Sequence, residues 1–140
     1  MKTISIIGSR EYQAPDAVRE FIATLDQEIV IIVGSWWKKV PREEDVRPTR
    51  GVDMVAALAA KERGMTVVCV AADFDYWEKR AGIKRNPVII ELGQEVVAFW
   101  DKKSPGTKYG IRYARKIKRP IRVFGPKGEE ERVWQQTDLL

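Results

Sequence analysis

Short apolar runs, rich in β-branched residues, recur along the chain and alternate with segments of helical spacing. The runs lack the strict polar and apolar alternation of a strand that has one solvated face; they cover residues 4–7, 29–33, 65–70, 95–100 and 121–124. Near-continuous hydrophobicity of this kind is typical of strands in a parallel sheet that is covered on both faces. The pattern therefore predicts about five buried, mostly parallel strands.

Apolar residues at helical spacing lie between these runs. They predict a first helix from Pro15 through Val18, Phe21, Ile22 and Leu25, and a second over 52–59 with Gly64 as its stop. A third helix is predicted over 88–92, with Asn86 as its cap and Pro87 as its first residue. A fourth is predicted over about 107–118, with Ile111, Ala114 and Ile117 inward. Strands that alternate with helices indicate βαβ units. We therefore expect one Rossmann-like three-layer α/β domain over residues 1–140, with a core of about 3–124.

Two segments do not fit the alternation. The connection from Gly34 to about Thr49 lacks clear periodicity and is longer than most connections in a compact domain, which indicates a lid, a binding loop or disorder. The C-terminal tail, residues 125–140, fits either an edge strand or a loose end. The sequence leaves both alternatives open.

The amino-acid composition limits the kinds of catalytic and binding site that the chain can form. The chain has no histidine, which excludes Ser-His-Asp and Cys-His catalysis and removes the commonest metal ligand. Its single cysteine, Cys69, cannot build a disulfide framework, and its place in an apolar run predicts a small buried side chain. The net charge of +5 suits an anionic partner without by itself indicating nucleic acid.

The hydrophobic runs are also too short for a membrane span, which needs roughly 20 apolar residues. The N-terminal run ends too soon, at Gly8, to be a signal peptide. We therefore expect a soluble cytoplasmic protein without a membrane partner.

Small polar residues and glycines follow the predicted strands. In an open α/β sheet, ligands bind outside the carboxyl ends of the strands; here those ends lead into Gly8-Ser9-Arg10, Gly34-Ser35, Ala72-Asp73, and Asp101 with Ser104-Pro105-Gly106-Thr107. Glycines allow close approach to a phosphate, helix starts offer N–H groups, and hydroxyl and guanidinium groups add donors. These residues predict a site for a nucleotide-derived phosphate ligand, although neither Gly-x-Gly-x-x-Gly nor a P-loop is present.

The order of these short motifs resembles the YspA / cpYpsA-related branch of the SLOG superfamily, which is named after the DNA-processing and lonely-guy proteins. The resemblance covers about residues 3–124 and rests on Gly8-Ser9-Arg10, Gly34, Arg50-Gly51-Val52-Asp53, Ala72-Asp73-Phe74, Ala81-Gly82, Arg85-Asn86, Ala98-Phe99-Trp100-Asp101 and Ser104-Pro105-Gly106-Thr107. It implies a Rossmann-like fold that binds nucleotides or nucleotide-derived molecules near 8–10, 50–53 and 104–107. Together with the aromatic residues it also favours a homo-oligomer.

Two departures from the family pattern change the expected function. Residues 36–48 look inserted between the second strand and Arg50, so the rim of the site is particular to this chain. Gly110 stands where the lonely-guy motif carries its glutamate. The missing acidic group favours binding or sensing over catalysis.

Three acidic residues keep a hydrolase as the alternative. Asp53 either complements the helix dipole or binds ribose while Arg50 faces phosphate. Asp73 and Asp101 either cap helices and solvate loops or act as acid and base, or bind a divalent cation with the ligand phosphate. No cofactor is firmly implied.

Two further groups could reach an anion. Asn86 is a predicted cap, and Arg85 beside it could contact a phosphate. Single-stranded nucleic acid is a less favoured partner, through Trp36-Trp37-Lys38-Lys39 and the basic run 112–119, which a solvated helix face also explains.

Overall fold

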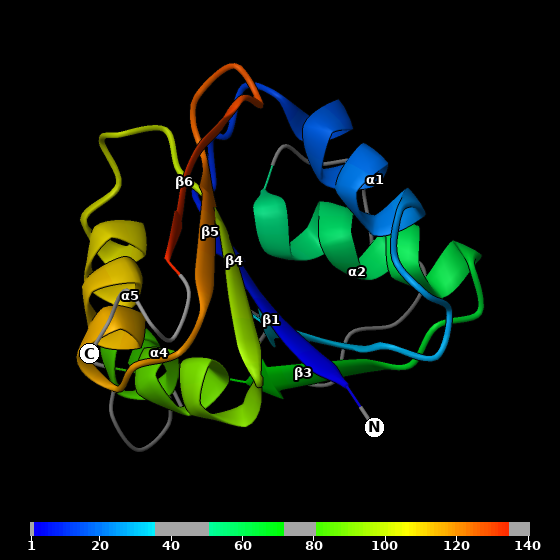
Figure 1. Cartoon of the computed structure of the whole chain (residues 1–140), viewed down its shortest axis with the longest axis horizontal. Helices are drawn as coiled ribbons and strands as arrows, with labels where there is room; N and C mark the ends of the chain where they lie inside the picture. Colours follow the sequence, from blue (N-terminus) through cyan, green and yellow to red (C-terminus); the bar gives the residue numbers. More distant parts are fainter. Residues whose placement is uncertain (1, 36–50, 72–80, 135–140) are drawn as a thin grey trace.

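The computed structural model describes residues 2–35, 51–71 and 81–134, which form a six-stranded sheet with helices on both faces (Figure 1). The strand order is β3-β2-β1-β4-β5-β6. The strands are β1 (Thr3–Gly8), β2 (Val30–Ser35), β3 (Val67–Ala71), β4 (Glu95–Phe99), β5 (Ile121–Phe124) and β6 (Glu130–Trp134). Strands β1 to β5 are parallel and β6 is antiparallel to β5. The predicted α/β fold is confirmed.

The strand order reverses between β1 and β4. From β1 the chain adds β2 and β3 on one side, and then returns to place β4 on the other side of β1. The two central strands end level with each other, since Gly8 of β1 pairs with Phe99 of β4. In doubly wound folds ligands bind at such a reversal, because the connections after the two strands diverge to opposite faces.

Helices α1 (Pro15–Ala23) and α2 (Val52–Glu62) cover one face of the sheet, and α4 (Ala81–Leu92) and α5 (Pro105–Lys116) cover the other (Figure 1). Each helix turns its apolar stripe inward: α1 buries Val18, Phe21 and Ile22, and α5 buries Ile111 and Ala114. These inward positions match the helical spacing in the sequence. Burial of each large side chain contributes about 1.5–3 kcal/mol.

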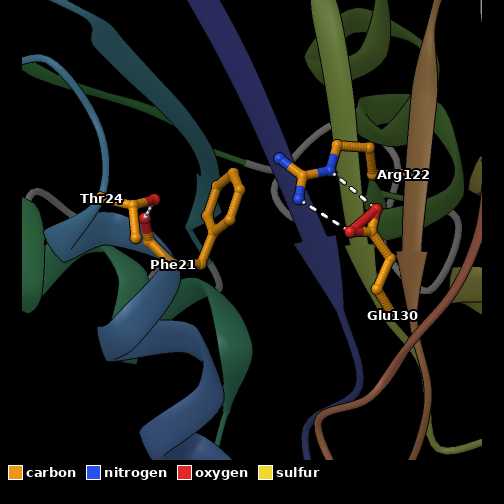
Figure 2. A network of polar contacts seen from close by, with 4 residues as sticks. All are labelled: Phe21, Thr24, Arg122 and Glu130. Carbon is orange, nitrogen blue, oxygen red and sulfur yellow. Dashed lines mark hydrogen bonds and ion pairs between the residues drawn. The ribbon is translucent and has the colours of Figure 1, made fainter.

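An aromatic cluster fills the core between α1 and the carboxyl ends of the strands. The rings of Phe99 and Phe124 stack at a centroid distance of 4.8 Å, and Phe21 meets both rings edge-on at 6.0 and 5.8 Å. Figure 2 shows the Arg122 guanidinium beside Phe21, with two hydrogen bonds of 2.9 Å to the Glu130 carboxylate. The guanidinium carbon lies 5.2 Å from the centroid of the Phe21 ring and 5.5 Å from that of Phe124, so the cation packs against both rings.

Helices α2 and α5 end in the same backbone motif. The N–H groups of Gly64 and Lys118 donate to the carbonyl three residues earlier (2.9 and 3.1 Å), and each following N–H donates to the carbonyl five residues earlier (3.0 and 2.9 Å). Both residues are left-handed, with φ of 71° and 62°. This is the Schellman motif, and it confirms Gly64 as the stop of α2.

The predicted start of the third helix is wrong. Helix α4 begins at Ala81, so Asn86 and Pro87 lie inside it instead of forming its cap and first residue. A proline inside a helix removes one main-chain hydrogen bond. Ile89 and Ile90, two and three residues after Pro87, are only 2 % and 0 % exposed. Packing of these side chains against the sheet holds the helix together across the proline.

The two edge strands of the described sheet bear on two expectations from the sequence. Residues 130–134 of the tail form the edge strand β6, so the edge-strand alternative is confirmed for these residues. At the other edge, Cys69 of β3 is exposed, so the prediction of a buried cysteine is wrong. An apolar run on an edge strand has a neighbouring strand on one side only, which sequence periodicity does not reveal.

The predicted inserted loop, residues 36–48, lies outside the described residues. No helix in the described part of the chain is long and apolar enough to cross a membrane.

Candidate functional site

Ser9 joins the elements that meet where the strand order reverses. Its N–H donates to the carbonyl of Phe99 on β4 (3.2 Å), and its own carbonyl accepts from the N–H of Val52, the first residue of α2 (3.3 Å). Its side-chain oxygen accepts from the N–H of Asp101 (3.3 Å). Ser9 is 1 % exposed, so one buried residue fixes the ends of β1 and β4, the start of α2 and the loop after β4.

Gly8 makes the close approach of α2 to β1 possible. A Cβ atom at this position would lie 2.5 Å from the side chain of Val52. Helix packing therefore requires the glycine, and the ligand role expected for Gly8 stays a prediction.

Asp101 organises the loop between β4 and α5. Its Oδ1 accepts hydrogen bonds from the N–H groups of Lys103 (2.9 Å) and Ser104 (2.8 Å). Burial opposes ionisation of this carboxyl, but the hydrogen bonds from Ser104, Lys103 and Ser9 outweigh it and lower the pKa of Asp101. Asp101 is therefore ionised at neutral pH, which suits a loop anchor better than a general acid.

The amino end of α5 is open. Ser104 holds the N-cap position without a side-chain cap, and the N–H groups of Gly106 and Thr107 have no hydrogen-bond partner among residues 2–35, 51–71 and 81–134. A Cβ on Gly106 would meet no atom within 4 Å. Unpaired N–H groups and the positive end of the helix dipole favour an anion at such a position.

Two side chains set the geometry of this helix start. The indole Nε1 of Trp100 donates to the carbonyl of Ser104 (3.1 Å). The Thr107 hydroxyl, in a residue only 5 % exposed, donates to the Ser104 Oγ (3.3 Å). The predicted residues Ser9, Asp101, Ser104 and Thr107 thus form one connected group beside Gly106.

The start of α2 is a poorer anion site than the start of α5. Gly51 is its N-cap residue, and the first N–H of the helix is already bound by Ser9. Burial raises the pKa of the Cys69 thiol on β3, and the negative charge of Asp53, in the first turn of α2, raises it further. Ser9 hydrogen-bonds both to Val52, next to Asp53, and to Asp101, so the two carboxylates belong to elements that meet at Ser9. The carboxylate pair considered from the sequence, Asp73 and Asp101, stays a prediction, because Asp73 lies outside the described residues.

For the remaining predicted site residues the structure gives only a position or an exposure, or does not describe them. Arg10 is exposed directly after Ser9, Gly34 is buried in β2 opposite Val70, and Asn86 is half-buried inside α4. For Ser35 and Arg85 only the backbone is described, and Arg50 and Asp73 lie outside the described residues.

Two contacts that sequence reasoning missed attach the β5–β6 hairpin to this site. The buried Tyr12, between β1 and α1, donates from its hydroxyl to the carbonyl of Gly125 (2.5 Å). Burial and then the charges of Glu129 and Glu131 raise the pKa of Tyr12 to about 12. Lys102, left-handed at φ 66°, pairs with Glu131 over 2.7 Å. No local sequence signal marks either long-range contact.

Groups of three or more metal-binding side chains are absent from the described ranges. The divalent cation considered from the sequence stays a prediction. Comparison of the chain with protein-family models, curated proteins and solved structures found no match. The function is therefore inferred from the geometry of the site.

Proposed function

We propose that the protein binds or senses a nucleotide or nucleotide-derived ligand whose phosphate lies at the amino end of α5. The open, uncapped helix start at Gly106 carries this proposal. It offers the N–H groups of Gly106 and Thr107 beside the point where the strand order reverses. Both features favour a phosphate at this position.

The resemblance to the SLOG superfamily supports the same location. Two of its three expected ligand segments, residues 8–10 and 104–107, are brought together here through the hydrogen bond between Ser9 and Asp101. Each hydrogen bond to a charged phosphate contributes about 1.5–3 kcal/mol. Three or four such bonds account for micromolar binding, which needs about 8 kcal/mol.

The hydrogen bonds of Asp101 and the glycine at position 110 favour binding over bond cleavage. Asp101 is hydrogen-bonded within its own loop. Gly110, at the position of the lonely-guy glutamate, packs so closely that a Cβ would lie 2.7 Å from the Ile7 side chain. A larger acidic residue there would require the Ile7 side chain to move. Finding cleaved products after incubation with nucleoside monophosphates or NAD would reinstate the hydrolase alternative.

A thermal-shift panel of nucleoside mono- and diphosphates, ADP-ribose and NAD tests the proposal. A ligand at one hundred times its Kd stabilises the folded state by about 2.7 kcal/mol, so a clear rise in Tm is expected. Gly106→Leu fills the open space and should abolish the shift while the protein stays folded. Ala23→Leu adds the same side chain to an exposed position at the far end of α1 and should retain it.

Two results would contradict the proposal. One is a folded protein that no compound of the panel stabilises. The other is a Gly106→Leu variant that responds as strongly as the Ala23→Leu control.

A further inference from the structure

The segment that contains α5 carries charge of one sign. Residues 102–119 include eight of the 25 lysines and arginines and none of the 20 acidic residues of the chain. The four cations within the helix, Lys108, Arg112, Arg115 and Lys116, are all exposed. The opposite side of α5 is apolar and buried against the sheet. The helix therefore presents a positive face to the solvent.

Three of these cations form a stripe that has no counter-charge among the described residues. Lys108, Arg112 and Lys116 follow one another at intervals of four residues, about 6 Å along the helix axis. They form no ion pair with another residue in the described part of the chain. Like charges at this spacing destabilise a helix. The stripe thus opposes helix stability, and a polyanion lying along it would remove the repulsion.

Two stacked tyrosines lie on the same helix. The rings of Tyr109 and Tyr113 are 15° from parallel at a centroid distance of 6.2 Å. The Tyr113 hydroxyl donates to the Glu91 carboxylate of α4, which fixes the inner ring. Tyr109 stays 44 % exposed. An exposed aromatic ring held in place among cations is suited to stack on an unpaired base.

We propose that this α5 face, made of Lys108, Tyr109, Arg112 and Lys116, binds single-stranded nucleic acid. The cations contact successive phosphates and Tyr109 stacks on a base. A membrane surface fits less well, because an interfacial helix inserts an apolar face, and Ile111 and Ala114 of α5 are buried at 7 % and 0 % exposure. This site lies on the side of the helix and is separate from the ligand proposed at its amino end.

The salt dependence of binding tests the cations. Fluorescence anisotropy would follow a labelled oligothymidylate at several salt concentrations, with the wild type and with Lys108→Gln/Arg112→Gln/Lys116→Gln. Each phosphate contact contributes about 0.7 to the slope of log K against log salt, so the triple variant should lose about 2. The control Lys2→Gln/Arg19→Gln/Lys127→Gln removes the same charge from exposed positions elsewhere and should keep the wild-type slope.

Tyr109 provides an independent test that distinguishes stacking from charge. Tyr109→Ala should weaken binding about tenfold without changing the salt slope, and Tyr109→Phe should bind like the wild type. Gly106→Leu should also retain strand binding, even if the nucleotide response is lost. Circular dichroism and thermal melts establish that the variants are folded.

Three outcomes would overturn the proposal. The first is a triple variant that binds as the control does, and the second is Tyr109→Ala with wild-type affinity. The third is tighter binding to phosphatidylserine vesicles or to duplex DNA than to the single strand.

Discussion

The side-chain oxygen of Ser9 accepts the N–H of Asp101 over 3.3 Å and so joins the loops that follow β1 and β4. Asp101 in turn holds the residues that lead into α5. The position of the open helix start at Gly106 therefore depends on a buried hydroxyl of a different loop.

Replacement of Ser9 by alanine should affect both stability and ligand response. Ser9→Ala leaves the Asp101 N–H without its partner, which should cost about 1 kcal/mol of unfolding free energy. The nucleotide-induced rise in Tm should shrink, because the lead-in to α5 is no longer anchored. Urea denaturation and thermal shift measure the two effects.

Ser5→Ala is the matched control. Ser5 is equally buried on β1, but its hydroxyl donates to the carbonyl of Ile89, away from the strand ends (2.5 Å). This variant should lose similar stability and keep the ligand response. Equal loss of the response in both variants would show that the Ser9 contact has no special role.

Two glycines of α5 should respond oppositely to alanine. Gly110→Ala places a Cβ 2.7 Å from Ile7 and 3.3 Å from Ile90, and overpacking of this kind costs about 1–3 kcal/mol. Gly106→Ala meets open space and should be neutral or stabilise by up to about 1 kcal/mol. Urea denaturation measures both values. Adding Ile7→Val to Gly110→Ala should restore part of the loss; no rescue would argue against this contact.

The two Schellman motifs predict a stabilising substitution. Lys118 adopts the left-handed conformation that glycine takes at the equivalent Gly64, and this conformation costs a non-glycine residue about 1–2 kcal/mol. Lys118→Gly should therefore raise the free energy of unfolding by about 1 kcal/mol after the greater entropy of glycine is counted. Gly64→Ala should lower it by a similar amount. A Lys118→Gly variant with an unchanged or lower Tm would contradict the argument.

Tyr12 predicts a change of stability at alkaline pH. Its pKa is raised from 10 to about 12 in the folded protein. Its proton is thus held more tightly in the folded state than in the unfolded state. The resulting stability is fully present below about pH 10 and is lost as the pH rises toward about 12.

Tyr12→Phe should remove this dependence. The difference in unfolding free energy between the wild type and the variant should shrink by about 2 kcal/mol over that interval. Urea denaturation at several alkaline pH values measures it, and the comparison cancels the titration of other groups. A difference that stays constant with pH would mean that Tyr12 titrates normally.

Most of the fold follows from local patterns in the sequence. The apolar runs locate the five parallel strands, and the spacing of Val18, Phe21 and Ile22 identifies the buried side of α1, because period and hydrophobicity are local properties. Non-local properties were harder to predict. The exposure of Cys69 depends on β3 being an edge strand, and the start of α4 depends on packing that overrides Pro87.

The residues of the candidate site could be predicted from the sequence, but the contacts between them could not. Ser9, Asp101, Ser104 and Thr107 were all expected near the strand ends, and the structure joins them. The meeting of β1, β4 and the start of α2 at Ser9 follows from the strand order, which the sequence does not reveal. The roles of Gly8 and Gly110 in packing depend on Val52 and Ile7, which are distant in sequence.

The β5–β6 hairpin has a consequence for motions of the site. Through Gly125 and Glu131 it contacts both Tyr12, in the loop after β1, and Lys102, in the loop after β4. Opening of either loop therefore has to break a contact to the same hairpin, which couples their local unfolding. Backbone amides of residues 125–131 should then exchange their hydrogens in step with the two loops, as one cooperative unit at the carboxyl edge of the sheet.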